Sequence, residues 1–325
     1  MKSITLTRYN TNHASNWNQF ITYAANGTFL FHRDFMGYHA DRFEDYSLMI
    51  FEEERLIAVL PAHQKGEDIF SHVGLTYGGL VWKKGLKLAT LLIVFQKVLE
   101  FLHENKYKTL TLKIIPEIYS AFPAQDLMYV VFAAEAQLIR RDALAVVDLK
   151  QPIILSKDRK EGVKRAEKNH LVFKETLDFE SFWNTLLIPM LEQKHQTQPV
   201  HSLQEILLLK KQFPEHIRLF AAYHDEVMIA GTVLFITTEV VHSQYIASQE
   251  NKSETGSLDG LHHYLLTQAF PNHRWFDFGI SNEENGKKLN QGLSYWKQSF
   301  GAHTMIQDVY TLDTSNHNLL NDVLI

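Results

Sequence analysis

The densest group of side chains suited to binding an anion lies between Lys157 and Lys168. This stretch, KDRKEGVKRAEK, has six basic and three acidic residues, and its lysines recur at i, i+3, i+7 and i+11, which places them on one stripe of a helix. Like charges at such spacing repel by about 0.2–0.5 kcal/mol per pair, and a bound anion would relieve that repulsion. The alternative is a solvated surface on which Glu161 and Glu167 pair with the lysines. Arg165 suits phosphate because a guanidinium fork binds two oxygens at once.

Two glycine-bearing segments could let a ligand approach the backbone closely. Gly74–Gly79 has three glycines in six residues, and glycine adopts positive φ without steric strain. Its plainer interpretation is a strand-to-helix turn. The second segment, NKSETGSLDG over 251–260, precedes a helix that we predict to begin at Ser257, a residue type that favours the N-cap position.

Histidine is abundant, but its spacing does not indicate a metal centre. There are 17 histidines and no cysteine, so disulfides, thiolate catalysis and Cys-ligated metals are excluded. His262 and His263 are adjacent and point to different faces of a helix, and no HExxH pattern is present. We therefore predict no structural metal. His195 is a candidate catalytic base and Tyr245 a candidate proton donor, with a surface histidine and a core tyrosine as the alternatives.

Near the C-terminus, Lys287–Phe300 reads as an amphipathic helix. Leu289, Leu293, Trp296 and Phe300 follow i, i+4, i+7 and i+11 and are predicted to form its buried face. Trp296 is by this pattern a core residue. Lys287 and Lys297 fall on the neighbouring polar stripe. We interpret Lys287 as a solvated lysine.

The elements that must position these residues follow the same order in both halves of the chain. In the first half we predict strands at Ile4–Tyr9, Ser47–Phe51, Leu56–Ala62, Ile69–His72, Thr109–Ile115 and Ala143–Leu149, and helices at Ala14–Ala25, Arg33–Ala40, Leu86–Glu104 and Leu127–Ala134. In the second half we predict strands at Leu171–Glu175, Arg218–Tyr223, Val227–Ile236, Val240–Ala247, Trp275–Gly279 and Thr304–Tyr310, and helices at Phe179–Gln193, Ser202–Gln212, Ser257–Ala269 and Lys287–Phe300.

This order indicates a duplicated domain. SLMIFEEERLIAVLPAH can be laid over RLFAAYHDEVMIAGTVLF, and each is followed by a strand, a glycine-bearing loop, a helix and a closing strand. The repeat spans about half the chain, far more than a solenoid repeat. We predict two α+β domains, residues 1–150 and 151–325, each with a mixed, mostly antiparallel sheet flanked by helices. The linker is expected at Lys150–Arg159.

Composition limits the classes of function. The chain has 325 residues, 45% hydrophobic and 21% charged, as expected for a globular protein of two domains. A net charge of -5 does not favour a DNA-binding protein. The first residues lack the apolar run of a signal peptide, and the longest apolar run, Leu88–Val94 with Phe95, is too short to span a bilayer, so a cytoplasmic protein without an integral membrane segment is expected.

Several segments, taken in order, resemble the FemAB-like acyltransferases, which carry two tandem acetyltransferase-like (GNAT) domains. These are ANGTFLFHRDFMGYH, SHVGLTYGGL, EGVKRAEKN and FDFGISNEENGKKLNQGLSYWKQSFGA, and together they cover nearly the whole chain. The resemblance implies transfer of an acyl or aminoacyl group from acyl-CoA or aminoacyl-tRNA to an amine, often on a cell-wall precursor. It implies no tightly bound cofactor, and tRNA as a possible partner.

The resemblance also implies roles for individual residues. Lys297 would contact the donor phosphate or the acyl oxygen, and His195 would be the base for the amine. Donor contacts would come from Tyr245, Gly256, Ser257 and Trp296. Acceptor contacts would come from Arg33, Thr76, Tyr77, Gly78, Arg165 and Lys168. Asp34, next to Arg33, is also explained as a helix cap.

The donor site is expected in the second half, between strands Val240–Ala247 and Trp275–Gly279 and the helix that begins at Ser257. An anionic, phosphate-bearing amine is expected as acceptor, in a cleft between the halves. One departure from the family concerns the loop before Ser257, where Glu254 and Asp259 would repel a pyrophosphate held at the helix N-terminus. A second hypothesis is therefore a non-catalytic binding protein with a degenerate tandem GNAT fold.

Overall fold

The chain divides into two compact units that are not the two halves of the sequence. The computed structural model describes residues 3–325, apart from the side chain of His195. Unit 1 comprises Met1–Asp142 with Ile306–Ile325, and unit 2 comprises Ala143–Met305. The predicted boundary at residue 150 falls shortly after this division. The return of the last residues to unit 1 was not predicted.

Unit 1 contains two sheets. The first is antiparallel throughout, in the order β1-β3-β4-β7. In the second, β2-β5-β6-β8-β17, only the β6–β8 pair is parallel. The strands of unit 1 are β1 (Ile4–Arg8), β2 (Glu44–Asp45), β3 (Leu48–Glu52), β4 (Arg55–Leu60), β5 (His63–Lys65), β6 (Asp68–Phe70), β7 (Val81–Trp82) and β8 (Thr109–Lys113). The chain division falls within two further strands, β9 (Gln137–Asp148) and β17 (His303–Asp313).

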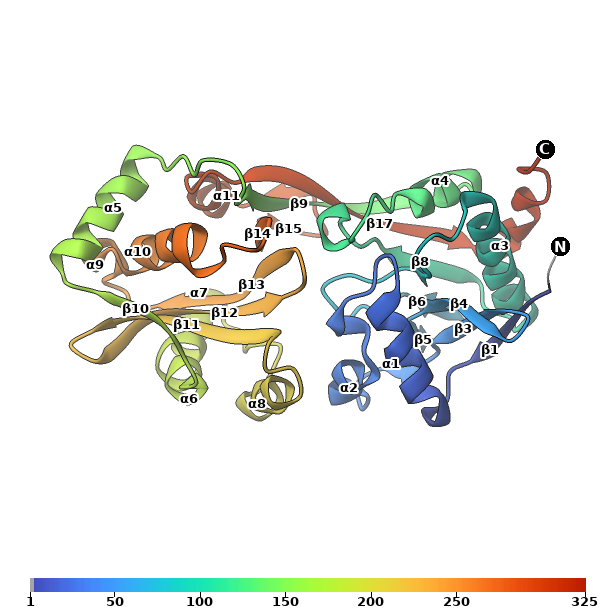
Figure 1. The fold of residues 1–325 in the computed structure, drawn as a ribbon, viewed down its shortest axis with the longest axis horizontal. Coiled ribbons are helices and arrows are strands. Elements are labelled where there is room, and N and C mark those ends of the chain that lie inside the picture. Colours follow the sequence, from blue (N-terminus) through green and yellow to red (C-terminus); the bar gives the residue numbers. More distant parts are fainter. Residues whose placement is uncertain (1–2) are drawn as a thin grey trace. The chain divides into compact units, whose positions relative to one another are not determined.

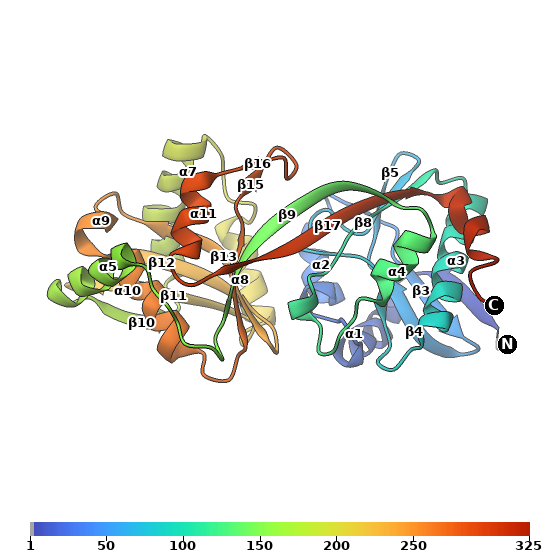
Figure 2. The same ribbon diagram turned by 90° about the horizontal axis from the view of Figure 1, so that it is seen from above.

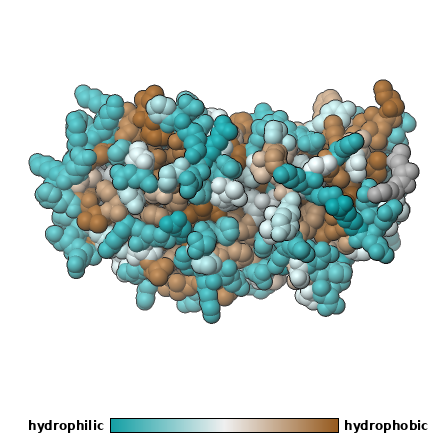
Figure 3. All heavy atoms as spheres, viewed as in Figure 1, coloured by the Kyte–Doolittle hydropathy of each residue, from teal (hydrophilic) through white to brown (hydrophobic). Residues whose placement is uncertain are grey.

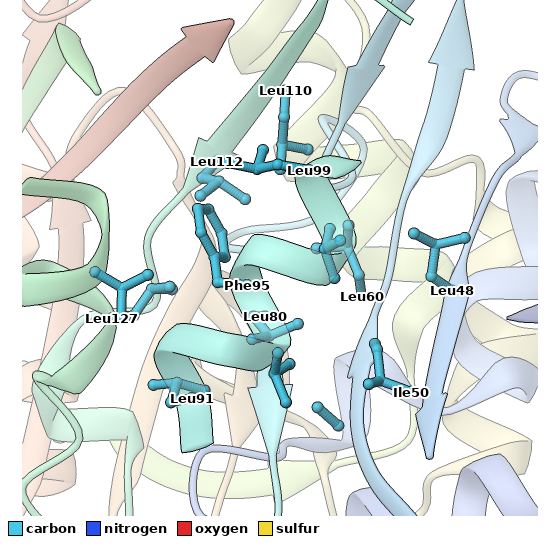
Figure 4. Close-up of a cluster of buried hydrophobic side chains, with 14 of the residues drawn as sticks. Leu48, Ile50, Leu60, Leu80, Leu91, Phe95, Leu99, Leu110, Leu112 and Leu127 are labelled. Atoms are coloured by element: carbon cyan, nitrogen blue, oxygen red, sulfur yellow. The ribbon is translucent and has the colours of Figure 1, made fainter. Parts of the chain in front are cut away.

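The long helix α3 is the centre of the unit 1 core. The other helices of this unit are α1 (Ala14–Tyr23), α2 (Arg33–Met36), α4 (Asp126–Ala133) and the short 3-10 segments Thr11–His13, Phe29–Phe31, Gly37–His39, Glu117–Tyr119 and η7 (Thr314–Leu320). In α3 (Leu88–Glu104), Leu91, Phe95 and Leu99 are buried, as the apolar spacing predicts. Figure 4 shows these side chains gathered with Leu60 of β4 and Leu110 of β8 in one cluster.

Unit 2 is built on one mixed sheet. Its order is β10-β11-β12-β13-β14-β9, and every neighbouring pair is antiparallel except β13–β14. The strands are β10 (Val172–Thr176), β11 (Ile217–His224), β12 (Val227–Ile236), β13 (Val240–Ser248) and β14 (Trp275–Ile280), with a separate hairpin of β15 (Asn282–Glu283) and β16 (Lys288–Leu289). The predicted α+β class, with mixed and mostly antiparallel sheets, is confirmed.

Helices cover both faces of this sheet (Figure 1). They are α5 (Lys157–Lys168), α6 (Phe179–Ser181), the π-helix η5 (Phe182–Leu187), α7 (Ile188–His195), α8 (Leu203–Gln212), α9 (Lys252–Thr255), α10 (Ser257–Tyr264), the π-helix η6 (Leu265–Ala269) and α11 (Gln291–Gln298). On one face, Leu258, Leu261 and Leu265 pack into a core with Phe276 and Phe300. Helix α5 packs against α10, and hydrophilic side chains cover it on its outer side (Figure 3).

The C-terminal helix differs from its prediction. It begins at Gln291, because Lys288 and Leu289 belong to the hairpin strand β16. Leu289 and Leu293 were expected in the buried face, but they are 56% and 40% exposed, whereas Lys297 is 4% exposed. The apolar spacing was therefore misleading here, and the buried residue of this helix is the lysine.

Candidate functional site

The ammonium group of Lys297 is enclosed in unit 2 at the end of strand β14. Its Nζ donates hydrogen bonds to the carbonyl oxygens of Gly279, at 3.1 Å, and Ile280, at 2.6 Å. Burial lowers the pKa of Lys297 to about 8, and the carboxylate of Asp277 opposes this by favouring the charged form. An ammonium has three N–H donors, and residues 3–325 provide no third acceptor for it. One of its three donors is thus not used by the described residues.

A bulge in β14 makes this seat for the lysine. The register between β14 and β9 shifts between Asp277 and Ile280, and Gly279 has a φ of 72°. The Gly279 N–H donates to Asp277 Oδ1 at 2.7 Å. Glycine adopts this left-handed conformation without strain, so the backbone can turn two consecutive carbonyls toward Lys297.

The strands β13 and β14 form a fork beside this bulge. They pair in parallel at three positions, the last being His242 with Asp277, and β13 then continues to Ser248 paired only with β12. The β12–β13 register also shifts, because Gln244 is an extra residue in β13. This is the region between β13 and β14 in which we expected the donor, and the strands do part there.

His242 and Asp277 form a buried pair at the base of the fork, which sequence reasoning missed. His242 Nδ1 lies 3.0 Å from Asp277 Oδ2, and the two side chains are 12% and 1% exposed. A Cβ on Gly279 would stand 3.3 Å from His242 Cε1, so a larger residue there would crowd the imidazole. The only sequence signal was the polar run His242–Gln244 in β13 and one carboxylate in the apolar strand β14; the pairing of His242 with Asp277 depends on strand register.

Tyr245 lies farther along β13, facing η5 and the segment before α8. Its hydroxyl is 2.6 Å from His201 Nδ1 and accepts a hydrogen bond from the His201 backbone N–H at 3.2 Å. Its ring makes an edge contact with Trp183, with centroids 5.2 Å apart. Trp296 packs on the other face of the sheet with His262 and Phe300, at centroid distances of 5.2 and 5.1 Å, as a core residue would.

The start of α10, where a donor phosphate was expected, is packed against α5. A Cβ on Gly256 would collide with the carbonyl oxygen of Gly162, and Gly256 has a φ of 72°. Ser257 is 1% exposed, and its hydroxyl has no hydrogen-bond partner among the described residues. Asp259 is buried and pairs with the guanidinium of Arg159.

The basic residues of α5 fall into two groups. Arg159 is directed inward, and Arg165 NH2 lies 3.9 Å from Asp259 Oδ2. Lys168 is exposed at the end of the helix, and Lys164 pairs with Glu161 at 3.0 Å. Burial raises the pKa of Asp259, while the cations Arg159, Arg165 and Lys252 oppose that shift. Three cations therefore lie near the Asp259 carboxylate at the start of α10.

The acceptor candidates of the first half, which are buried or partly buried, make contacts within unit 1. Arg33 donates to Ser47 Oγ at 3.0 Å, pairs with Asp45, and has its pKa lowered to about 10 by burial. Tyr77 is 1% exposed and donates to Thr28 Oγ1 at 3.0 Å. The Thr76 carbonyl accepts from Gln307, and the Gly78 N–H donates to the carbonyl of Lys113. Each residue thus has a structural partner.

His195 ends α7, and its side chain lies outside the described part of the chain. An open cavity of about 650 Å³ lies between η5–α7 and the end of β13, lined among others by Met190, Glu192, Ser248 and Glu250.

Within residues 3–325, no group of three or more His, Asp or Glu side chains is placed to hold a metal ion. No helix in this range is long and apolar enough to cross a bilayer.

Comparison with known proteins gives the fold. No protein-family model and no curated protein matches the chain. Among solved structures, FemX superposes with a TM-score of 0.68 at 9% identity, covering 95% of this chain and 97% of FemX. The C-terminal domain of a putative lysylphosphatidylglycerol synthetase from Agrobacterium fabrum gives 0.61 at 12% identity, covering 97% of this chain and 96% of that domain.

A tandem GNAT protein from the clavulanic acid biosynthesis pathway, in its form without AcCoA, gives a TM-score of 0.56 at 12% identity and covers 96% of this chain and 99% of that one. The chain therefore has the fold that FemX and this tandem GNAT protein share, as its sequence segments indicated. At these identities the likeness extends to the fold alone.

Proposed function

We propose that the chain is an N-acyltransferase whose reaction takes place at the β13–β14 fork of unit 2. The observation that supports this most is Lys297, a buried ammonium with two donors fixed on the carbonyls of β14 and one donor left over. A buried charge is expensive to maintain unless it is paired or used, and no carboxylate of the described residues lies within hydrogen-bond distance of this one. The fold of acyltransferases agrees with such a use.

The chemistry follows from what an acyl transfer needs. Attack of an amine on a thioester or ester turns the carbonyl oxygen into an oxyanion, and a donor that is already fixed in a water-poor site stabilises it. The leftover N–H of Lys297 would supply that contact. Removing one such contact lowers the rate on the order of 100-fold or more.

The donor would be acyl-CoA or aminoacyl-tRNA. In both, phosphates lie some distance from the acyl group, and the basic residues near the α5–α10 contact provide a surface for them. Lys168 is exposed and Arg165 is 41% exposed, so both can reach a phosphate. Because Arg165 lies beside Asp259 at the start of α10, we assign both here to the donor, instead of to the acceptor as the sequence predicted. The acceptor would be an amine, with a cell-wall precursor as the class that the resemblance suggests.

The test is a ligand panel followed by a transfer assay. Thermal shifts of the full chain should identify a ligand among CoA, acetyl-CoA, longer acyl-CoAs and nucleotide-linked amino sugars, and mass spectrometry should then detect the acylated amine. Arg165→Glu with Lys168→Glu should weaken CoA binding and flatten its salt dependence, because exposed charges are screened beyond about 8–10 Å at physiological salt. Absence of both binding and transfer with CoA thioesters and with aminoacyl-tRNA would falsify the proposal.

One observation favours the second candidate, a binding protein without catalysis. Gly256 packs directly on the Gly162 carbonyl, and Asp259 lies at the start of α10, so this helix start is less open to a pyrophosphate. A ligand that raises the melting temperature while no amine is acylated, even at saturating ligand, would favour this candidate.

A further inference from the structure

A second polar group at the fork has a free, partly accessible nitrogen. His242 uses Nδ1 to contact Asp277 Oδ2 at 3.0 Å, and its Nε2 has no hydrogen-bond partner among residues 3–325. The side chain is 12% exposed, whereas Asp277 is 1% exposed. His242 is also the last residue of β13 that pairs with β14. The ring is thus held from one side and open on the other, where the strands part.

Asp277 is itself fixed in place. Its Oδ1 accepts from the Gly279 N–H at 2.7 Å, and Lys297 lies close enough for its charge to interact with this carboxylate. A buried carboxylate on Nδ1 holds the proton at that nitrogen and stabilises the imidazolium that forms when Nε2 takes up a second proton. Gly279 leaves free the space beside the ring, since a Cβ at this position would stand only 3.3 Å from Cε1.

From this geometry we infer that His242 is the general base of the proposed acyl transfer and that Asp277 is its positioning residue. The inference rests on the proposed function. An ammonium acceptor loses one proton to solvent, and its neutral nitrogen attacks the acyl carbon of a thioester. As the C–N bond forms, that nitrogen gives a proton to His242 Nε2. The C–S bond then breaks, and the thiolate takes the proton from the imidazolium, which restores the neutral histidine.

Two other described histidines of unit 2, His201 and His262, fit the role less well. His201 contacts Tyr245 through Nδ1, but it is 4% exposed and packs between Phe235 and Tyr245. His262 is fully buried on the opposite face, with Nδ1 on the carbonyl of Leu258 at 2.8 Å. His242 alone among these three combines a carboxylate partner with a side chain that reaches solvent.

The first measurement needs no substrate. In the full chain labelled with ¹⁵N-histidine, long-range ¹H–¹⁵N spectra report which ring nitrogen carries the proton, and His242→Gln identifies the signals. We expect the neutral His242 ring to carry its proton on Nδ1, and Asp277→Asn to reduce that preference. A ring that is protonated on Nε2, or a preference unchanged by Asp277→Asn, would overturn the inference.

The second measurement uses acetyl-CoA with two probe amines. Hydroxylamine is a weak base, so the nitrogen of its adduct with the thioester loses its proton readily without help, whereas the adduct of glycine methyl amide, a more basic primary alkylamine, holds that proton more tightly and needs a base. His242→Gln should lower transfer to the alkylamine on the order of 100-fold or more and leave transfer to hydroxylamine nearly unchanged. Asp277→Asn should act in the same direction, and both variants are compared only after their melting temperatures show that they are folded.

The outcomes separate the two proposals. Equal loss with both amines, or no loss with either, contradicts the role of His242 while leaving the acyltransferase proposal intact. Failure of the unmutated chain to acylate either amine counts against CoA thioesters as donors, and the ¹⁵N spectra then decide whether His242 has the protonation that a base requires.

Discussion

Lys297 has a structural role in addition to the catalytic role that we propose for it. Its hydrogen bonds to the carbonyls of Gly279 and Ile280 satisfy two backbone acceptors of the β14 bulge. A buried acceptor left without a partner costs about 1–3 kcal/mol, so this lysine stabilises the bulge that also places Asp277. Any test of its catalytic role must therefore measure folding as well.

We expect Lys297→Ala to lower the free energy of unfolding by about 1–3 kcal/mol, because the β14 carbonyls lose their donor. Transfer activity should fall on the order of 100-fold under conditions where the variant is folded. Urea unfolding and the transfer assay provide the two readouts. Lys287→Ala, at an exposed lysine ten residues earlier, is the control and should change stability by less than about 0.5 kcal/mol. A normal melting curve for Lys297→Ala would contradict the hydrogen bonds, and full activity would contradict the catalytic role.

Two buried histidines of unit 1 should make the stability of the fold depend on pH. His63 and His72 lie in the interior of unit 1, with ring centroids 5.3 Å apart and 5% and 4% exposed. Burial lowers the pKa of His63 to about 4, with a smaller effect from Lys65, and lowers the pKa of His72 to about 2, with further contributions from His39, His63 and Arg33. Both rings are therefore neutral in the folded protein, whereas a histidine in an unfolded chain has a pKa of about 6.5.

Acidification should therefore destabilise the protein before its carboxylates titrate. Below about pH 6.5 the unfolded chain takes up protons that the folded chain does not, so the stability present above that pH falls as the pH decreases toward about 4. Each such histidine contributes up to about 1.4 kcal/mol per pH unit. Urea unfolding between pH 7.5 and 5 (roughly the range before carboxylates protonate) measures the slope. His63→Leu should reduce it and exposed His303→Gln should not; equal slopes would refute the assignment.

At the scale of elements, the contact between α5 and α10 depends on glycines. Gly256 has a φ of 72°, and its Cα faces the backbone of Gly162 and Ala166. Gly162 in turn leaves room for the Asp259 carboxylate that Arg159 binds. Backbone atoms cannot move aside as a flexible side chain can, so the two helices have no means of accommodating a methyl group at Gly256.

Gly256→Ala should destabilise unit 2 by more than about 1 kcal/mol, from the strained φ and from the collision with α5. The control is Gly292→Ala in α11, where a Cβ would meet nothing closer than 3.9 Å. Alanine is favoured over glycine inside a helix by about 0.5–1 kcal/mol, so this variant should be as stable as the parent or more so. Thermal unfolding of both variants distinguishes them, and the same melting temperature for both would show that α5 and α10 are not packed in this way.

The sequence predicted best the elements whose positions are determined locally. Helix α3 has a continuous apolar stripe and α5 has lysines at helical spacing, so both were found close to their observed bounds. The N-cap of α5 is Ser156, whose side chain accepts from the Arg159 N–H. Helix α11 was predicted too long, because the hairpin β15–β16 takes residues that have helical spacing. Lys297 was selected through the family resemblance, but its burial depends on carbonyls 17 and 18 residues away, and the His242–Asp277 pair depends on strand register. A local sequence pattern predicts neither the burial of Lys297 nor the pairing of His242 with Asp277.

At the scale of the whole molecule, the path of the chain decides which unit is made of one continuous segment. Unit 2 is one continuous segment, Ala143–Met305, whereas unit 1 needs Ile306–Ile325 in addition to its N-terminal part. Within unit 1, β17 pairs with β8 from Val309 to Asp313, and Leu312 and Leu320 belong to the core around α3. Figure 2 shows the C-terminal segment beside α3. A domain cut at residue 150 would lack this strand and its two core leucines.

Removal of residues 306–325 from the full chain should therefore unfold unit 1 and leave unit 2 folded. The truncation exposes one edge of β8, deletes Leu312 and Leu320 from the core, and removes the Thr314 hydroxyl that donates to the carbonyl of Tyr107 at 2.6 Å. Loss of two buried leucines alone costs about 4–10 kcal/mol, which is comparable to the stability of a whole domain. Removal of Leu324 and Ile325, which are exposed, is the control. Hydrogen exchange read by mass spectrometry distinguishes the outcomes: α3 should lose its protection while β12 and β13 keep theirs, and protection retained in α3 would show that unit 1 does not depend on its C-terminal strand.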